Sequence, residues 1–138
     1  MGVPVLDAGV LVGFLDAADL HHKSARDALV TAQDDGHRLI IPASAFAESL
    51  VGPSRRGEDA VGELRQFVKR LPIDVIPLDE SIALAAAALR ARHGGRLKLP
   101  DALLVATART LDVDVLITTD KDWPSRSKLG LRAKLLHL

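Results

Sequence analysis

The chain of 138 residues contains no cysteine and carries a formal net charge of zero. The lack of cysteine excludes disulfides, thiolate metal sites and a cysteine nucleophile. Because the charges balance, any nucleic-acid binding must depend on a local basic patch, and three Phe, one Trp and no Tyr argue against an aromatic platform for stacking bases.

The length predicts one domain over residues 1–138. The apolar start is interrupted by Pro4 and Asp7, unlike a signal peptide, and no uncharged run approaches the ~20 residues of a membrane span. We therefore expect a cytoplasmic protein without membrane contact. The abundance of Ala and Arg suggests a bacterial source.

Short apolar segments alternate with helical patterns along the chain. In the first half we expect a strand at 3–6, helices at 8–16 and 24–33, a strand at 38–41, a helix at 43–51 ended by Gly52 and Pro53, a basic turn at 54–57 and a helix at 58–70. In the second half we expect a strand at 73–76, a helix at 80–92, a loop at 93–96, a helix from Pro100, a strand at 113–117 and an edge strand near 135–138. This alternation predicts an α/β fold whose parallel strands are joined by right-handed crossovers.

The segment from Leu99 to Trp123 carries the strongest chemical signal. Pro100 suits the first helical position, and Asp101 falls in the first turn, where the helix dipole favours a carboxylate. The helix is apolar on most faces and leads into a β-branched strand that ends at an acidic loop, 118–122. Ligands in open α/β sheets bind beyond the carboxyl ends of the strands, so this loop is a candidate site.

Four carboxylates are expected at that edge of the sheet. Asp7 ends the first strand, Asp120 follows the fourth, Asp101 starts the helix that leads into the fourth, and Glu48 lies in the helix after the second. At ~4 Å and an effective dielectric near 20, each like-charged pair costs roughly 4 kcal/mol, so either some acids are protonated or a divalent cation lies among them. Oxygen-only ligands favour Mg²⁺ or Mn²⁺.

Each acid also has a structural explanation on its own. Asp101 suits a helix start, Asp120 suits a turn, and Glu48 suits an exposed helix position. Asp7 is the hardest to explain in this way, because it ends an almost wholly apolar strand. The joint placement of the four acids carries the hypothesis.

At these residues the chain resembles PIN-domain ribonucleases, and more narrowly the VapC-type toxins of VapBC toxin–antitoxin systems. The matching segments are VLDAGVLVGFLD, ASAFAESL, LPDALLVATA and LITTDKDW. The resemblance implies an α/β/α sandwich around a mostly parallel sheet of four to five strands. It also implies Mg²⁺-dependent RNA hydrolysis by metal-activated water, which leaves 5′-phosphate and 3′-hydroxyl ends, and inhibition by a VapB-type antitoxin. A homodimer is expected, which forms a heterotetramer or larger assembly with the antitoxin.

The resemblance assigns the catalytic and metal-binding roles to Asp7, Glu48, Asp101 and Asp120, with Asp122 as a further ligand and Thr118 as the supporting hydroxyl of a TxD motif. One departure is Gly9, where the family usually has Ser or Asn. This departure predicts the loss of a supporting hydrogen bond near Asp7.

Residues outside the acidic set supply candidates for RNA contacts. Arg55 and Arg56 in the basic turn, together with Lys121, are candidates for binding RNA phosphates, although a solvated turn is the preferred explanation of the two arginines. Trp123 is expected to pack against the sheet edge, with base stacking as the alternative.

Three other functional classes compete with the ribonuclease. A receiver-like domain would need an acid pair after strand one and a phospho-acceptor after strand three, but Ala8 follows Asp7 and strand three ends at Pro77. A haloacid-type phosphatase would need an acid in place of Gly9. A PIN-like binding module without catalysis is the remaining alternative, and the full set of four acids argues against it.

Overall fold

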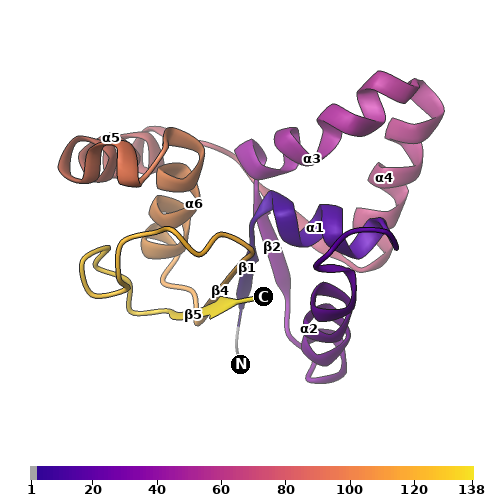
Figure 1. The fold of residues 1–138 in the computed structure, drawn as a ribbon, viewed down its shortest axis with the longest axis horizontal. Helices are drawn as coiled ribbons and strands as arrows, with labels where there is room; N and C mark the ends of the chain where they lie inside the picture. Colours follow the sequence, from indigo (N-terminus) through magenta and orange to yellow (C-terminus); the bar gives the residue numbers. More distant parts are fainter. Residues whose placement is uncertain (1–2) are drawn as a thin grey trace.

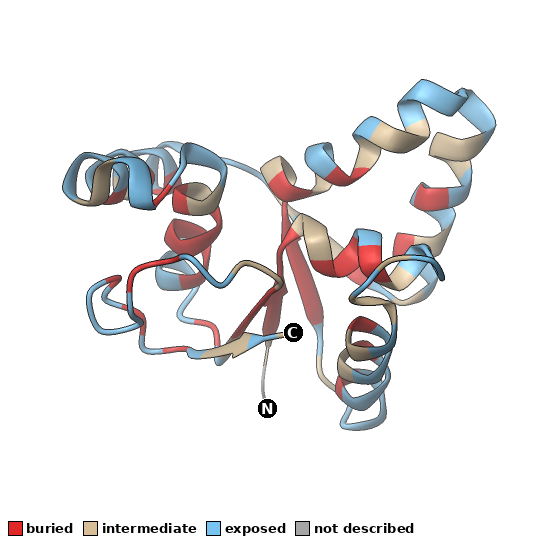
Figure 2. Ribbon diagram, in the orientation of Figure 1, coloured by how far each residue is buried: buried red, intermediate tan, exposed pale blue. Residues whose placement is uncertain are grey.

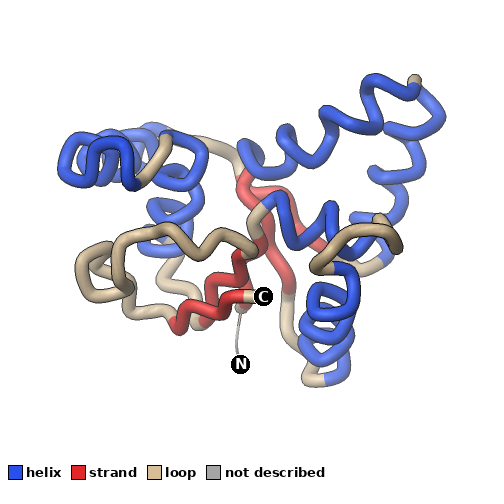
Figure 3. Tube along the Cα trace, in the orientation of Figure 1, coloured by secondary structure: helices blue, strands red, loops and turns tan. Residues whose placement is uncertain are grey.

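Five parallel strands form a single sheet in the computed structural model, which describes residues 3–138 (Figures 1 and 3). The order across the sheet is β3-β2-β1-β4-β5. The strands are β1 (Pro4–Leu6), β2 (Leu39–Pro42), β3 (Ile73–Ile76), β4 (Val115–Thr118) and β5 (Lys134–His137). Every adjacent pair is parallel, which confirms the predicted α/β class and the edge strand near the end of the chain.

Six α-helices cover the two faces of the sheet (Figure 1). They are α1 (Ala8–Leu15), α2 (His22–Asp34), α3 (Ala43–Arg56), α4 (Glu58–Arg70), α5 (Glu80–His93) and α6 (Leu99–Thr110). Helices α5 and α6 pack on one face and α1 to α4 lie on the other, which gives the expected three-layer sandwich. A short 3-10 turn, Gly94–Arg96, joins α5 to the segment before α6.

Alternating side chains along each strand build two separate cores, as the two-residue period of a strand requires. In β1, Val5 faces the core under α5 and α6, whereas Leu6 faces the core under α1, α2 and α4. In β4, Leu116 faces the core under α5 and α6, and Ile117 faces the other core. The central strands are therefore buried on both faces, as Figure 2 shows, and this explains their almost continuous apolar sequences.

The strand order places a topological switch between β1 and β4. From β1 the chain builds β2 and β3 on one side, and then returns to add β4 and β5 on the other. Such switch points open a crevice at the carboxyl ends of the strands. The order also differs from the 2-1-3-4-5 order of receiver domains, so the receiver-like alternative is wrong for this chain.

Helix α3 corrects two of the predicted boundaries. It continues through Gly52 and Pro53 to Arg56 and does not end at residue 51, so Arg55 and Arg56 lie in a helical turn and not in a loop. A proline normally disfavours helix at the preceding residue by colliding with its Cβ, but Gly52 has none. Gly57, at φ 123°, then ends the helix and separates it from α4.

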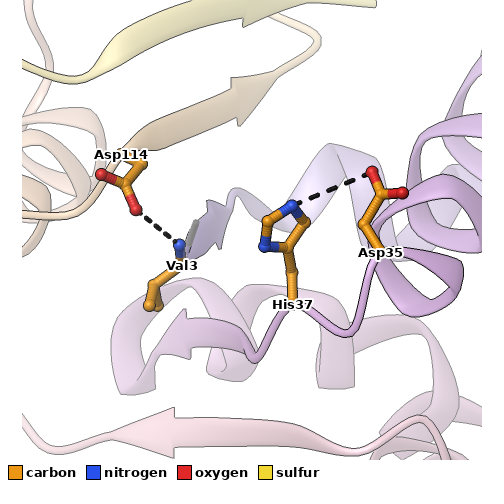
Figure 4. A network of polar contacts seen from close by, with 4 residues as sticks. All are labelled: Val3, Asp35, His37 and Asp114. Carbon is orange, nitrogen blue, oxygen red and sulfur yellow. Dashed lines mark hydrogen bonds and ion pairs between the residues drawn. The ribbon is translucent and has the colours of Figure 1, made fainter. Parts of the chain in front are cut away.

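The other boundaries match the expected ones or differ from them by at most two residues. The fourth strand starts at Val115 and not at 113, because the chain first turns through Asp112 at φ 49°. Asp114 accepts a hydrogen bond from the Val3 backbone N–H at 3.0 Å, and His37 lies 3.9 Å from Asp35 (Figure 4). The residues in these contacts lie just before strands, so the contacts stabilise the edge where the strands begin and not the edge where the acids lie. Within residues 3–138, no helix is both long and apolar enough to cross a membrane.

Candidate active site

A cavity of about 190 Å³ opens at the carboxyl edge of the sheet, beside the β1/β4 switch. The side chains of Asp7, Glu48, Asp101 and Asp120 all line it. They arrive from the end of β1, from α3, from the start of α6 and from the loop after β4. The other lining residues are Ala8, Gly9, Ala45, Pro100, Leu104 and Thr119. The structure therefore brings together the four acids named from the sequence.

Asp7 is fixed at the floor of this pocket by the sheet register. Leu6 pairs with Ile117, so the residues that follow them, Asp7 and Thr118, lie side by side. The Thr118 hydroxyl donates a hydrogen bond to Asp7 Oδ2. The Asp7 carboxylate also caps α1, since Oδ1 accepts from the Val10 N–H at 3.2 Å. The side chain is 8% exposed, and this burial raises its pKa, although the bond from Thr118 opposes the rise.

A single hydroxyl links two of the acids. The Asp120 backbone N–H donates to Thr118 Oγ1 at 3.0 Å, and the same hydroxyl donates its proton to Asp7. Thr118 is completely buried, so it positions the Asp120 loop on the Asp7 carboxylate. This is a structural basis for the supporting role that the sequence assigned to Thr118.

Thr118→Val is expected to lower the free energy of unfolding by about 1–3 kcal/mol, because it leaves the partly buried Asp120 N–H and a buried Asp7 carboxylate oxygen without this partner. Urea unfolding at neutral pH measures the change. Thr107→Val is the matched control, since the Thr107 hydroxyl is 1% exposed and bonds only to the Leu103 carbonyl of its own helix. Equal losses in both variants would show that the link between the two acids adds no stability.

Asp101 lies in the first turn of α6, and its carboxyl group is partly buried. Burial, followed by the nearby charge of Asp120, raises its pKa from 3.8 to about 6. The indole N–H of Trp123 opposes the rise, although it makes no hydrogen bond of normal geometry. The Trp123 ring is 7% exposed and packs in the core under α5 and α6, so it is not available for stacking on a base.

Glu48 stands at the rim of the pocket. It projects from α3 and is exposed, as its structural explanation required, yet it still lines the cavity. Partial burial and the charge of Asp7 both raise its pKa. Ala45, one turn earlier on α3, is 4% exposed and small enough to keep the helix close to the sheet edge.

The donor set suits a hard divalent cation, but the carboxylates are not gathered into one cage. Among residues 3–138, no three Asp, Glu or His side chains are close enough to hold one ion together. A site in which all four carboxylates serve one ion, some of them through a bridging water, stays a prediction. Mg²⁺ usually keeps several waters and binds through one or two carboxylates, and oxygen donors of this kind fit that mode.

Several predicted residues do not line the pocket. Asp122 is exposed, and its backbone N–H donates to Asp120 Oδ1 at 2.8 Å, so it supports the loop through its main chain. Lys121 is exposed beside it, and Arg55 and Arg56 are exposed at the far end of α3.

Thr119 lines the pocket, and the sequence interpretation missed it. A Cβ placed on Gly9 would collide with the Thr119 hydroxyl and would lie 3.2 Å from Asp7 Oδ1. The missing side chain at position 9 thus leaves a space that Thr119 fills. The signal in the sequence was the glycine itself, two residues after the first acid.

The PIN domain family matches residues 5–129 of this chain. No curated protein sequence matches it. Among solved structures, the chain is similar to a toxin–antitoxin complex from Klebsiella pneumoniae, with 24% identity, coverage of 85% of this chain and 86% of the other, and a TM-score of 0.67.

Two further structures share the fold. VapBC2 from Rickettsia felis, bound to a promoter DNA fragment, has 17% identity, 96% coverage of both chains and a TM-score of 0.73. VapC20 from Mycobacterium tuberculosis, a toxin that cleaves the Sarcin-Ricin loop, has 16% identity, coverage of 82% and 86%, and a TM-score of 0.69. The family match extends over most of the sequence and includes all four segments that carry the acids, and the chain belongs to the PIN domain family.

Proposed function

We propose that this protein is a divalent-cation-dependent endoribonuclease that acts as the toxin of a toxin–antitoxin pair. The observation that carries the proposal is the pocket at the β1/β4 switch, where four carboxylates from four separate elements meet. The fold it shares with VapC toxins supports the toxin role.

The charge of the pocket explains why a cation is needed. Among its lining residues there are four acids and no Lys, Arg or His, so the pocket on its own repels a phosphodiester. Asp7, Glu48, Asp101 and Asp120 would hold Mg²⁺ or Mn²⁺. When bound, such an ion supplies activation of water and stabilises the negative charge that builds up on the phosphoryl group.

The protein groups divide the remaining work. The Thr118 hydroxyl and the Val10 N–H both donate hydrogen bonds to Asp7, and these bonds fix the position of its carboxylate. Asp101, with a pKa of about 6, is mostly ionised at neutral pH, and a bound cation would compensate its charge and favour the ionised form further. Glu48 at the rim remains open to solvent and to an incoming RNA strand.

We propose a VapB-type antitoxin as the partner and a homodimer as the toxin unit, joined in a heterotetramer or larger assembly. Similar folds occur in toxin–antitoxin complexes from Klebsiella pneumoniae and Rickettsia felis. On this chain, Val12 and Leu15 of α1 and the 92% exposed Leu20 offer apolar side chains that a partner helix would cover.

The test is an RNA cleavage assay with the purified chain. We expect cleavage of a total RNA pool in Mg²⁺ or Mn²⁺, no cleavage in EDTA, recovery when the ion is restored, and inhibition by the product of the neighbouring reading frame. Cleavage that persists in EDTA would reject the cation-dependent chemistry. RNA binding without cleavage under any divalent ion would favour the inactive binding module.

Arg55 and Arg56 make different predictions within this function, because α3 is helical to its end. Arg55 lies seven residues after Glu48, which places it on the same helix face and about 10 Å further along, whereas Arg56 is rotated away by about 80°. Arg55→Ala is expected to weaken RNA binding several-fold and to reduce the salt slope by about 1. Arg56→Ala removes the same charge and is the control. If both variants weaken RNA binding equally, the two arginines contribute only through the overall charge of the protein.

A further inference from the structure

We propose that Thr119 is a substrate-contacting residue of the acidic pocket, whose hydroxyl donates a hydrogen bond to a phosphate oxygen of the bound RNA, and that Gly9 is required to make room for it. The proposal rests on the proposed function for the identity of the ligand. The contact between the two residues stands on the structure alone.

The first observation is the composition of the pocket wall. Among its lining residues, Thr119 carries the only side-chain hydrogen-bond donor once the four acids are ionised. Within residues 3–138, its hydroxyl has no hydrogen bond to another protein group, unlike that of Thr118, which is committed to Asp7. A free donor in a wall of acceptors is suited to a ligand that presents acceptor oxygens, and a phosphodiester does so.

The second observation is the packing around Gly9. This residue is part of α1, where alanine is ordinarily more stable than glycine. A Cβ there would overlap the Thr119 hydroxyl and would approach the Thr119 Cβ to 3.4 Å. The glycine therefore leaves free the volume that the hydroxyl occupies.

The third observation places this pair beside Asp7. The backbone N–H groups of Gly9 and Thr119 both help to hold down the pKa of the Asp7 carboxyl group. The position of a Cβ on Gly9 lies 3.2 Å from Asp7 Oδ1. The free hydroxyl is thus next to the most buried acid, where a cation would bring the phosphate. The space left by Gly9 of α1 is occupied by the Thr119 hydroxyl, which comes from the loop after β4.

A stability cycle tests the contact without any RNA. In the parent, Gly9→Ala is expected to lower the Tm, because the new methyl group displaces Thr119. In a Thr119→Ala background the same change is expected to raise the Tm by about 3 °C, the ordinary gain of alanine over glycine in a helix. The opposite signs would support the contact. A rise of equal size in both backgrounds would overturn it.

An activity series tests the hydrogen bond. Thr119→Ala is expected to lower kcat/KM for RNA by at least about tenfold, the value of one hydrogen bond to a charged phosphate oxygen, whereas Thr119→Ser keeps the hydroxyl and stays near the parent. The double variant Gly9→Ser with Thr119→Ala moves the hydroxyl to position 9 and is expected to recover most of the loss. Full activity in Thr119→Ala, or failure of both hydroxyl-bearing variants, would overturn the role.

The two proposals fail in different ways. If the parent cleaves no RNA with any divalent ion, the proposed function and the phosphate contact that rests on it are both rejected, while the stability cycle still decides whether Gly9 and Thr119 are a matched pair. If the parent cleaves RNA and Thr119→Ala does so equally well, only the role of Thr119 is rejected.

Discussion

Asp7→Asn is expected to abolish divalent-dependent RNA cleavage, with a loss of more than about 100-fold, while changing the free energy of unfolding little. The loss of activity follows from the loss of charge, because an amide of the same shape is a weak ligand for a hard cation. Asn remains a good N-cap, so α1 keeps its bond from the Val10 N–H.

Two opposing effects set the stability of this variant. Removing a buried carboxylate relieves the desolvation that raises its pKa, and it also relieves repulsion from the neighbouring acids. Against this, an amide that keeps the cap turns its NH₂ group towards Thr118, so the hydroxyl loses its acceptor. These two effects oppose one another, so we expect the free energy of unfolding to change by no more than about 1 kcal/mol.

The measurement combines an RNA cleavage assay in Mg²⁺ with a thermal melt in EDTA. Asp34→Asn is the control, because Asp34 is an exposed aspartate at the end of α2, on the opposite edge of the sheet. An inactive Asp7→Asn protein that also melts far below the parent would show that Asp7 is mainly structural. An active one would remove Asp7 from the chemistry.

Asp101→Asn is expected to stabilise the cation-free protein at pH 8 but not at pH 4.5. The pKa of Asp101 is raised from 3.8 to about 6 in the folded state, so the folded chain binds this proton more tightly than the unfolded chain. The stability that this provides is fully present below about pH 4 and is lost as the pH rises through 6. At pH 8 the parent therefore carries a buried charge that the amide lacks.

The size of this effect is about 1–2 kcal/mol at pH 8, after allowing for the partial exposure of the side chain. Urea unfolding in EDTA at the two pH values measures it, and the difference between them is the quantity of interest. Asp59→Asn controls for the helix dipole, since Asp59 is an exposed aspartate in the first turn of α4. A gain that is independent of pH would mean that the carboxyl group is not titrating in this range.

The acids were predictable from the sequence because their positions depend on topology. Asp7 and Asp120 follow apolar strands, and Asp101 starts the helix that returns to one of them, so any right-handed parallel arrangement brings the three to one edge. The placement of Glu48 depends on packing, because a helix position six residues past the end of β2 reaches the edge only if the helix packs close to the sheet. The buried Ala45 provides that close packing.

What the sequence did not indicate depends on atomic packing. The continuation of α3 through Pro53 depends on the Cβ missing from Gly52, which a rule that treats both residues as helix breakers overlooks. The position of Thr119 in the pocket depends on how its hydroxyl packs against Gly9. The spacing of apolar residues in the sequence carries no information about such a contact.

The hydrogen bond between Thr118 and Asp7 joins residues that are 111 positions apart in the sequence. A contact of such separation closes late, since the entropy of a long loop must be overcome before the contact is gained. During synthesis, Asp7 leaves the ribosome long before the strand that will orient it. A nascent or truncated chain that lacks β4 therefore has no assembled acidic pocket. The proposed activity destroys RNA, and the ribosome itself contains RNA. On this proposal, the chain has no active pocket during synthesis until β4 has emerged from the ribosome.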